Sequence, residues 1–341
     1  MEQQYKYMVY VGCMTYNHAP YIKETLDGFC GQQTTFPYVC GIIDDASTDG
    51  EPALLRQYLQ DYFEIKNPAL VKKEETDDYI MVFARHKENV NCYFAVYFLK
   101  YNHYQMGKKS KLPYVSQWLY GSKYYAICEG DDYWSDPLKL AKQVKILESD
   151  SEIGLCYASA KVYDEDSHSF SKEIKGHKFD TFEQQLLWNY IPTLTVCMRT
   201  DLRRRYEAEK KTWEEAKSWK MGDFPMWLWF CLNGKIVFLD DIVAVYRVTS
   251  GTASRPQTLE GQLAFVESTY SIKMHFAKMA QVDSMITNKI ELDRNKGLAY
   301  TYINNGEYKE GISYSKRLPL FIRIRVFLYM VKRILINDYN I

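Results

Sequence analysis

Short apolar runs alternate with polar loops and helical patterns along the first 150 residues of the chain. The runs at residues 7–13, 38–43 and 123–128 are bounded by turn residues, which predicts three buried strands. Apolar residues at helical spacing follow each run, at residues 20–31, 52–63 and 137–148. Strand, polar loop and helix in repeated order predict parallel βαβ units, whose loops meet at one edge of the sheet.

The pattern is less regular between and after these units. Apolar residues at helical spacing predict a helix over residues 88–104, and residues 154–160 are a further strand candidate. The polar stretch 161–178 is typical of a loop. Two short strands, 235–239 and 243–248, close the series.

From about Thr258 the pattern predicts helices without strands, and Asn304-Asn305-Gly306 marks a turn between two of them. We therefore predict an α/β fold. It has a Rossmann-like, mostly parallel central sheet flanked by helices, followed by a helical C-terminal region. The predicted domains are a sheet domain over residues 1–251 and the helical region over residues 252–341.

Composition and charge exclude some classes of partner and indicate the cellular compartment. The chain carries 43 Lys and Arg and 43 Asp and Glu, so no overall field attracts nucleic acid, and we expect no nucleic-acid partner. Eight cysteines without Cys-x-x-Cys spacing predict buried thiols of a reducing compartment, not disulfides or a zinc site. The polar first residues and the lack of a long uncharged apolar run predict a cytoplasmic chain without signal peptide or membrane span.

Polar and acidic residues follow each of the three predicted strands. Thr15-Tyr16-Asn17 comes after the first strand, Asp44-Asp45 after the second and Asp131-Asp132 after the third. In an open α/β sheet the carboxyl ends of the strands line the ligand crevice, so these side chains are candidate ligand contacts. The plain alternative for residues 129–137 is an acidic strand-to-helix turn, in which Asp136 caps the following helix.

Five motifs in order carry a resemblance to a known family. They are Met14-Thr15-Tyr16-Asn17, Ile43-Asp44-Asp45-Ala46-Ser47-Thr48-Asp49, Glu129-Gly130-Asp131-Asp132-Tyr133-Trp134, Met221-Gly222-Asp223-Phe224-Pro225-Met226-Trp227 and Tyr246-Arg247-Val248-Thr249-Ser250-Gly251. Over roughly residues 7–251 the chain resembles the family-2 inverting glycosyltransferases of bacterial type, which have the GT-A fold. The resemblance implies transfer of a hexosyl-type sugar from a nucleoside diphosphate sugar, with inversion at the anomeric carbon. It also implies a saccharide or lipid-linked saccharide acceptor in surface polysaccharide or glycan synthesis.

The resemblance further implies roles for the residues that bind the donor. Tyr16 matches the position that stacks the nucleobase, with Thr15 and Asn17 beside it. Asp45 matches the position that hydrogen-bonds the base edge, which favours uracil and hence a UDP-sugar. Asp131 matches the acid that reaches the ribose.

Two further acids match the chemical steps of the family. Asp132 matches the acid that holds a divalent cation against the diphosphate. Carboxylate and phosphate oxygens suit Mn²⁺ or Mg²⁺, which neutralises charge developing on the departing diphosphate. Asp223 matches the general base that accepts the proton of the acceptor hydroxyl. The plain alternative for Asp223 is the N-cap of an apolar helix, and the two roles are compatible.

The chain departs from the family pattern at several positions. Thr249 stands where some relatives carry a histidine, so no third metal ligand is assigned there. His168 and His177 lie in the polar stretch and are expected to be exposed loop residues. The candidates for binding the diphosphate, each with an ordinary ion pair as its alternative, are Arg85, Lys87 and Arg247.

Two other functions compete with this interpretation. A sugar-phosphate nucleotidyltransferase also uses a βαβ sheet and metal-bound carboxylates, but it would open with a glycine-rich phosphate loop. Gly12 is the only glycine in residues 5–20, so no glycine-rich phosphate loop is present there. The same observation argues against dinucleotide and P-loop functions. A catalytically inactive nucleotide-sugar-binding relative is the second alternative. The retention of Asp45, Asp131, Asp132 and Asp223 together argues against it.

The last predicted helix, residues 318–336, combines apolar and basic residues and contains no acid. On a helical wheel Arg325, Lys332 and Arg333 share one side and Arg323 is out of place. The apolar side consists of Leu320, Phe321, Ile324, Phe327, Leu328, Val331 and Leu335. A basic amphipathic helix suits an anionic membrane surface, which fits an enzyme acting on a lipid-linked acceptor at the cytoplasmic face. Packing against the catalytic domain is the alternative, and the sequence leaves both open.

Overall fold

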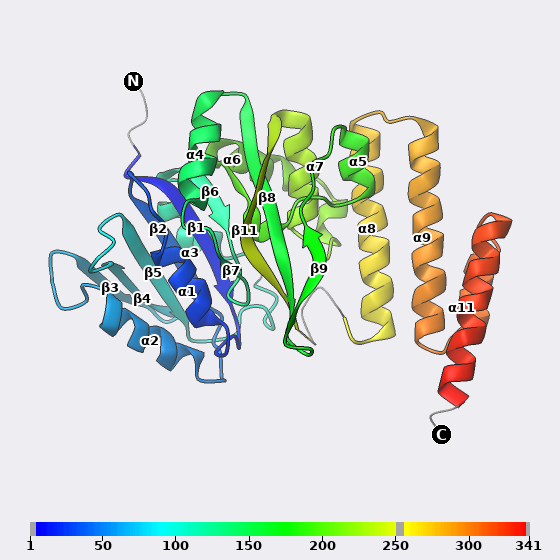
Figure 1. Cartoon of the computed structure of the whole chain (residues 1–341), viewed down its shortest axis with the longest axis horizontal. Coiled ribbons are helices and arrows are strands. Elements are labelled where there is room, and N and C mark those ends of the chain that lie inside the picture. Colours follow the sequence, from blue (N-terminus) through cyan, green and yellow to red (C-terminus); the bar gives the residue numbers. More distant parts are fainter. Residues whose placement is uncertain (1–4, 109, 250–255, 339–341) are drawn as a thin grey trace. The chain divides into compact units, whose positions relative to one another are not determined.

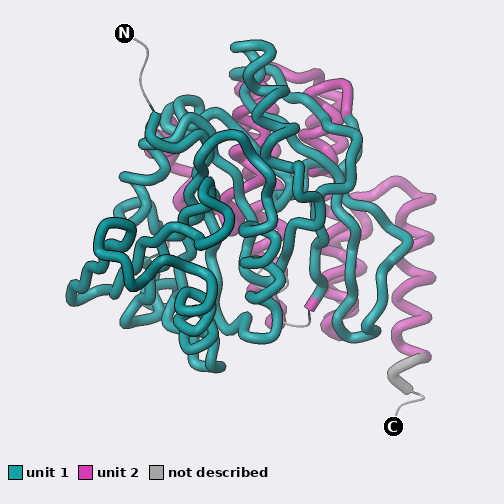
Figure 2. Tube along the Cα trace, turned by 60° about the vertical axis from the view of Figure 1, so that its left-hand side comes forward, with its two compact units in different colours: residues 1–178, 190–207, 233–248 teal, residues 179–189, 208–232, 249–341 magenta. Residues whose placement is uncertain are grey.

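The computed structural model describes residues 5–108, 110–249 and 256–338. The chain divides into two compact units, coloured separately in Figure 2. Unit 1 comprises residues 1–178, 190–207 and 233–248, and unit 2 comprises residues 179–189, 208–232 and 249–341. The predicted boundary between residues 251 and 252 lies outside the described residues, and the predicted division at that point stays a prediction.

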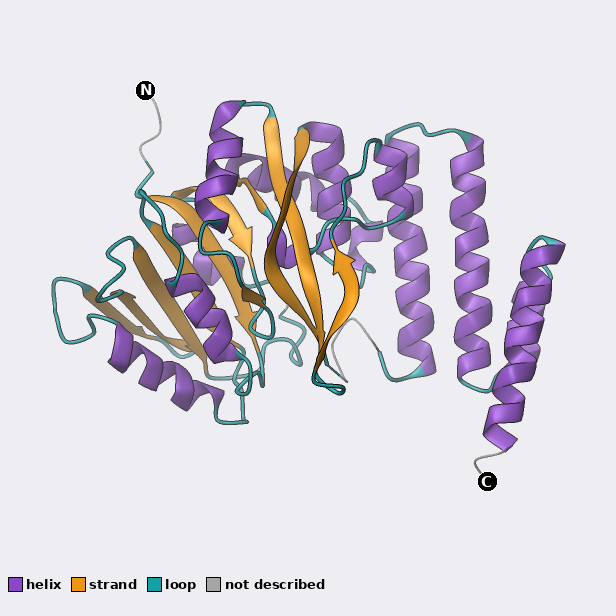
Figure 3. Ribbon diagram, viewed as in Figure 1, coloured by secondary structure: helices purple, strands orange, loops and turns teal. Residues whose placement is uncertain are grey.

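Unit 1 is built on an eleven-stranded sheet, shown in orange in Figure 3. Its strand order is β3-β4-β5-β2-β1-β6-β10-β8-β11-β7, with β9 paired to β8. The central strands β5 (Cys92–Leu99), β2 (Tyr38–Asp44), β1 (Tyr7–Thr15) and β6 (Ser122–Ile127) are all parallel. These strands contain the three predicted runs and one strand that the pattern did not reveal.

The outer strands make the sheet mixed. β3 (Val71–Glu75) and β4 (Tyr79–Arg85) add antiparallel strands beyond β5, and β10 (Cys197–Arg199) runs antiparallel between β6 and β8. The remaining strands are β7 (Tyr133–Trp134), β8 (Ile153–Asp164), β9 (Ser169–Lys175) and β11 (Lys235–Val248). β8 and β11 are parallel to each other. The α/β class, with a central sheet flanked by helices and a helical C-terminal region, is confirmed (Figure 1).

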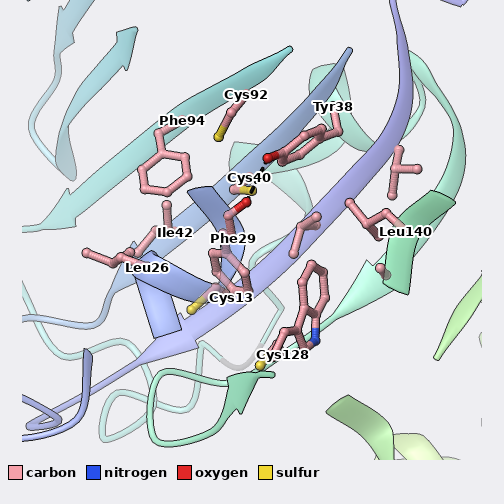
Figure 4. Packing of buried hydrophobic residues seen from close by; sticks show 14 of the residues in the cluster. Cys13, Leu26, Phe29, Tyr38, Cys40, Ile42, Cys92, Phe94, Cys128 and Leu140 are labelled. Atoms are coloured by element: carbon pink, nitrogen blue, oxygen red, sulfur yellow. Dashed lines mark hydrogen bonds between the residues drawn. The ribbon is translucent and has the colours of Figure 1, made fainter. Parts of the chain in front are cut away.

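Helices cover both faces of the sheet. α1 (Ile22–Cys30), α2 (Glu51–Tyr62) and α4 (Lys139–Ser149) pack on one face, and α3 (Leu112–Leu119) packs on the other. Ile22, Leu26 and Phe29 recur at helical spacing along α1, so all three side chains are buried in the first of these layers. Figure 4 shows the hydroxyl of Tyr38 donating to the backbone carbonyl of Phe29 at 2.7 Å, which satisfies the polar tip of a fully buried ring.

Two secondary-structure predictions in unit 1 are wrong, and a third is right except that its two short strands are one strand. Residues 92–99 form β5, not part of a helix, because a central strand covered on both faces carries an almost unbroken apolar run. Residues 235–248 form one strand, β11, which stays paired with β8 through register shifts between Leu239 and Ala244. The polar stretch 161–178 contains β9, whose exposed residues pair with β8 in a hairpin. α4 also starts later than predicted, with Asp136 accepting the N–H of Leu138 one turn before the helix.

Unit 2 contains the helices that follow the sheet. These helices are α8 (Leu259–Met279), α9 (Ser284–Asn304), α10 (Tyr308–Ser315) and α11 (Leu320–Asp338). α9 contacts α8, α10 and α11, and α10 also contacts α11. The side chain of Thr258 caps α8, and a left-handed glycine, Gly306, makes the predicted turn after α9. The other helices of the chain are α5 (Phe182–Leu187), α6 (Thr200–Lys210), α7 (Asp223–Asn233) and the short 3₁₀ segments Thr193–Thr195 and Glu215–Lys217.

Two predicted properties of the chain can be checked against the structure. All eight cysteines are free thiols, buried or half-buried, as the lack of a spacing motif predicted. Within the described ranges, no helix combines the length and apolar character that a bilayer crossing requires.

Candidate functional site

Three predicted motifs meet at one edge of the sheet because β1 lies between β2 and β6. Thr15, the last residue of β1, is in register with Asp44, the last residue of β2. The N–H of Asp45 donates to the carbonyl of Thr15 at 3.0 Å, and the N–H of Gly130 donates to the carbonyl of Met14 at 2.9 Å. The loops that follow the three strands are therefore tied to one another by backbone hydrogen bonds.

Glu51, the first residue of α2, is the centre of this arrangement. Its side chain is fully buried and accepts hydrogen bonds from the hydroxyl of Thr15, the N–H of His18 and the hydroxyl of Ser47. The carboxylate therefore joins the loop after β1 to the loop after β2. No motif marks Glu51 in the sequence, where only its place two residues after Asp49 at a predicted helix start is visible.

Further contacts fix the same two loops. The N–H of Asn17 donates to Ser47 at 2.9 Å, and the side-chain carbonyl of Asn17 accepts the N–H of Thr48 at 2.8 Å. Asn17 has a left-handed backbone (φ 56°), which asparagine tolerates better than most residues. Tyr16, between these anchored residues, keeps its side chain 37% exposed. A ring held at a fixed backbone position and open to solvent can stack on a flat ligand.

Asp45 is buried and already has three hydrogen-bond donors. The N–H groups of His103 and Tyr104 each donate to its carboxylate at 3.0 Å, and the ammonium of Lys111 donates at 2.8 Å. Asp45 and Lys111 thus form a buried ion pair that anchors the segment between β5 and α3. A carboxylate has about four acceptor positions, so the three donors among the described residues leave about one for a further donor. Lys111 is not marked by any motif either, because it belongs to a basic turn without a distinguishing pattern.

Asp44, the neighbour of Asp45, is buried, and no ion pair to it is found among the described residues. Its Oδ1 accepts the N–H of Ser47 at 3.0 Å. Burial raises the pKa of Asp44 to about 6, and the hydrogen bonds from Ser47 oppose part of that shift. The carboxyl of Asp44 therefore titrates close to neutral pH.

The loop after β6 packs tightly against the loop after β1. A Cβ atom on Gly130 would collide with the side chain of Thr15, so only glycine fits at this position. The hydroxyl of Thr25 on α1 lies within hydrogen-bond distance of the carbonyls of Gly130, at 3.0 Å, and Asp132, at 2.6 Å. These contacts set the backbone that carries Asp131 and Asp132.

Asp132 lies in an acidic environment. Its side chain is 4% exposed, and its Oδ1 accepts the backbone N–H of Arg247 at 2.7 Å. Burial, followed by the negative charges of Asp131 and Glu129, raises the pKa of Asp132 well above its usual range. A divalent cation would oppose this effect, because its positive charge stabilises the ionised carboxylates.

The residues at Asp132 fit a cation that is shared with the donor. Among the described residues, the only hydrogen bond to the Asp132 carboxylate is the one on Oδ1, which leaves the lone pairs of Oδ2. No three His, Cys, Asp or Glu side chains converge on one point within residues 5–108, 110–249 and 256–338. Oxygen atoms of a diphosphate would therefore have to complete the coordination shell.

Arg247 is held in a structural role rather than free to bind a ligand. Its guanidinium is buried and pairs with Glu24 and Glu165, and the rings of Tyr21 and Tyr133 each lie 5.0 Å from it. Of the other two diphosphate candidates, Lys87 donates to the backbone carbonyls of Gln60 and Asp61. Arg85 is half-buried at the end of β4.

The remaining predicted residues lie apart from these loops in the chain. Asp223 is the first residue of α7, in unit 2, and its Oδ1 accepts the N–H of Phe224 at 2.7 Å. His168 and His177 are both exposed, as predicted. Thr249 is half-buried, and Ser250 and Gly251, which end the fifth motif, lie outside the described residues.

Comparison with known protein families and sequences gives one family and several relatives. The profile of Glycosyl transferase family 2 matches residues 10–91. The uncharacterized protein Rv1520 of Mycobacterium tuberculosis (strain H37Rv) is 30% identical over 237 residues, which are 69% of this chain and 57% of that protein. The uncharacterized protein Mb1547 of Mycobacterium bovis matches to the same extent. The chain thus spans little more than half the length of these curated relatives.

Solved structures show where the fold recurs. The mannosyltransferase PcManGT from Pyrobaculum calidifontis, in complex with GDP-Man and Mn²⁺, has a TM-score of 0.52 and 15% identity. The match covers 99% of this chain and 83% of that one. Residues 1–349 of TarS from S. aureus give a TM-score of 0.51 at 15% identity, over 96% of this chain and 87% of that one. The fold expected from the sequence motifs is confirmed.

Proposed function

The chain belongs to glycosyl transferase family 2 and has the GT-A fold, and from that premise we propose the reaction that it catalyses. It moves a sugar, of hexosyl type, from a nucleoside diphosphate sugar to a saccharide or lipid-linked saccharide acceptor. The configuration at the anomeric carbon is inverted. The product belongs to surface polysaccharide or glycan synthesis.

One observation carries this proposal: the loops after β1, β2 and β6 bring an exposed aromatic ring and four acids to one sheet edge. Tyr16 stacks the nucleobase, and Thr15 and Asn17 hold its backbone in place. Asp45 accepts the base N–H with its remaining lone pair, which favours uracil and therefore a UDP-sugar. Asp131 hydrogen-bonds the ribose.

Asp132 holds the divalent cation, Mn²⁺ or Mg²⁺, together with the donor diphosphate. When bound, the cation stabilises negative charge on the departing diphosphate. The carboxylate of Asp132 is oriented for this by the N–H of Arg247. PcManGT, a neighbour in fold, was determined with Mn²⁺ and a nucleotide-sugar, which supports the use of a divalent cation in the proposed reaction.

Asp223 is the general base. It accepts the proton of the acceptor hydroxyl while the hydroxyl oxygen forms a bond to the anomeric carbon and the bond to the diphosphate breaks. Its place as the first residue of α7 puts the carboxylate where the helix dipole favours an anion. A structural role at the start of the helix, where Oδ1 accepts the N–H of Phe224, is compatible with this function.

We place the enzyme in the cytoplasm, in peripheral contact with the inner face of the cell membrane. Nucleotide-sugars are cytoplasmic metabolites, and lipid-linked acceptors present their saccharides at a membrane surface. Eight free thiols are compatible with a reducing compartment.

The test is a donor screen with and without Mn²⁺, scored by release of nucleoside diphosphate in the presence of acceptor extracts. Wild-type protein should release UDP from one UDP-sugar in a metal-dependent way. Asp132→Ala should lose metal-dependent donor binding, and Asp223→Asn should retain donor binding while transfer falls by about 10²–10⁴-fold.

Two outcomes would contradict the proposal. Formation of nucleotide-sugar from a sugar phosphate and UTP would establish the nucleotidyltransferase alternative. Donor binding without turnover on any acceptor, with Asp223→Asn behaving like the wild type, would favour an inactive binding relative.

A further inference from the structure

The C-terminal helix α11 packs against unit 2 through one narrow stripe. Val326 is fully buried in a cluster with Ala299 and Ile303 of α9, and Leu318 just before α11 joins the same cluster. The hydroxyl of Tyr329 donates to the side chain of Asn304 at 2.6 Å, and the guanidinium of Arg333 donates to the carbonyl of that residue at 3.4 Å. The packed stripe therefore includes Arg333, which the helical wheel had grouped with the solvated basic residues.

The opposite stripe of α11 is apolar and exposed. Six large side chains are 50–63% exposed, namely Leu320, Phe321, Ile324, Phe327, Leu328 and Leu335. At about 100° per residue they fall within one third of the helix circumference, on the side away from Val326. These residues, with half-buried Val331, are called the α11 apolar stripe below. α11 thus packs against α9 and α10 through its other side, and the face predicted to be apolar stays exposed.

Basic side chains border this stripe on both sides. On the same wheel Arg325 and Lys332 lie along one edge and Arg323 lies along the other, and all three are exposed. Residues 311–337 contain six Lys and Arg and no Asp or Glu, although the whole chain has a formal charge of zero. The positive charge is therefore concentrated in α11 and in the residues just before it.

We propose that the α11 apolar stripe binds the surface of an anionic lipid bilayer. Apolar side chains bordered by Lys and Arg match a bilayer interface, where the apolar groups enter the acyl region and the cations reach lipid phosphates. A second copy of the same face is disfavoured as the occupant, because a symmetric contact would bring the two sets of cations together. An acidic protein groove would satisfy the charge as well, so the test must separate it from lipid.

This inference deepens the proposed function by naming the surface that contacts the membrane. It does not depend on the reaction, because vesicle binding is measured without donor, metal or acceptor. A failure to bind vesicles would leave sugar transfer intact, and a failure of sugar transfer would leave the vesicle result intact.

The experiment is co-sedimentation of the full chain with large vesicles, one set of neutral phosphatidylcholine and one containing about 30% phosphatidylglycerol. The wild-type protein should bind the anionic vesicles at least tenfold more tightly, and high salt should weaken that binding. The double variant Phe321→Ser/Leu328→Ser should lose at least tenfold in affinity. Arg323→Gln/Arg325→Gln/Lys332→Gln should lose the preference for anionic lipid.

Met285→Ser is the matched control, because Met285 is a 74% exposed apolar residue of α9 in the same unit and outside the α11 apolar stripe. It should bind vesicles like the wild type, and circular dichroism should show all variants folded, since the changed residues are exposed. Equal vesicle binding by wild type and the Phe321/Leu328 variant would overturn the proposal. So would the absence of vesicle binding, whether or not sedimentation then shows self-association or association with an added acidic protein.

Discussion

The backbone N–H of Arg247 donates to Oδ1 of Asp132 at 2.7 Å, across 115 positions of the chain. The bond joins the end of β11 to the loop after β6. The guanidinium of Arg247 is held by Glu24 and Glu165, so the backbone that orients Asp132 is fixed by two ion pairs. Arg247 therefore positions the proposed metal ligand through its backbone, while the charge of its guanidinium is paired with Glu24 and Glu165.

Asp132→Asn should remove metal binding while improving the stability of the metal-free protein. Asparagine keeps the acceptor for the N–H of Arg247 but carries no charge. Because burial and nearby acids raise the pKa of Asp132, its ionised form is destabilising in the folded metal-free state. We expect Mn²⁺ with UDP to raise the Tm of the wild type by several degrees and that of the variant by none, measured by thermal shift.

The control for this change is Asp77→Asn, since Asp77 is exposed between β3 and β4. It should show the wild-type response to Mn²⁺ and an unchanged metal-free Tm. A variant at Asp132 that still responded to Mn²⁺ like the wild type would assign the metal to other ligands.

Glu51→Gln should weaken donor binding more than it slows chemistry. The amide nitrogen cannot accept a hydrogen bond, so at least one of the groups of Thr15, His18 and Ser47 loses its partner. We expect a loss of about 1–3 kcal/mol in the free energy of unfolding and a rise of about tenfold in the KM for the donor. The kcat should stay within about twofold, because Glu51 touches no reacting group.

Steady-state kinetics and urea unfolding of Glu51→Gln would measure both effects, with Glu88→Gln, an exposed glutamate, as the control. A drop in kcat with an unchanged KM would show that Glu51 acts in the chemical step. An unchanged KM and kcat would show that the two loops hold their geometry without it.

The sequence pattern predicted those parts of the fold in which the local pattern of apolar and turn residues matches the element that is buried. β1, β2 and β6 are short apolar runs between turn residues, and Thr258 and Gly306 mark a helix start and a turn by their own chemistry. β5 was missed because a strand buried on both faces has no alternation, and its flanking residues extended the apolar run to helical length. The spacing of apolar residues alone could not distinguish a strand buried on both faces from a helix.

The candidate site was predictable only for residues that belong to motifs. Tyr16, Asp45 and Asp132 follow strands and match a known pattern, whereas Glu51 and Lys111 were missed. The functions of Glu51 and Lys111 arise from partners 36 and 66 positions away, and no local signal encodes such a pairing. For the same reason the helical wheel of α11 identified its apolar face but not the stripe that packs on α9.

Lys111→Met should expose how far Asp45 depends on its buried cation. Removing one partner of a buried ion pair leaves an uncompensated charge, which typically costs about 3–5 kcal/mol. Adding Asp45→Asn should recover part of that loss, so a double-mutant cycle should give a coupling of more than about 1 kcal/mol in the free energy of unfolding. Urea unfolding of the four proteins provides the measurement.

Lys100→Met is the control for the same cycle, because Lys100 begins the same segment and pairs with Glu75, whose side chain is exposed. It should show little coupling with Asp45. Additive effects of Lys111→Met and Asp45→Asn would mean that the ion pair contributes nothing specific to the fold of the segment between β5 and α3.

Asp44→Asn should remove a pH dependence of stability that lies below neutral pH. The pKa of Asp44 is about 6 in the folded protein and 3.8 for an ordinary aspartate, so the folded state binds the proton more tightly than the unfolded state. Stability from this group is present at low pH and declines as the pH rises between about 4 and 6. The shift corresponds to a cost on the order of 2–3 kcal/mol above pH 6.

Asparagine keeps an oxygen for the N–H of Ser47 and has no charge to bury, so the variant should exceed the wild type in free energy of unfolding at pH 7. The difference between the two proteins should shrink towards zero at pH 4. Urea unfolding at intervals from pH 4 to pH 8 would measure the difference, with Asp77→Asn as the exposed control. A difference that does not change with pH would show that the Asp44 carboxyl has the same pKa in the folded and unfolded chain.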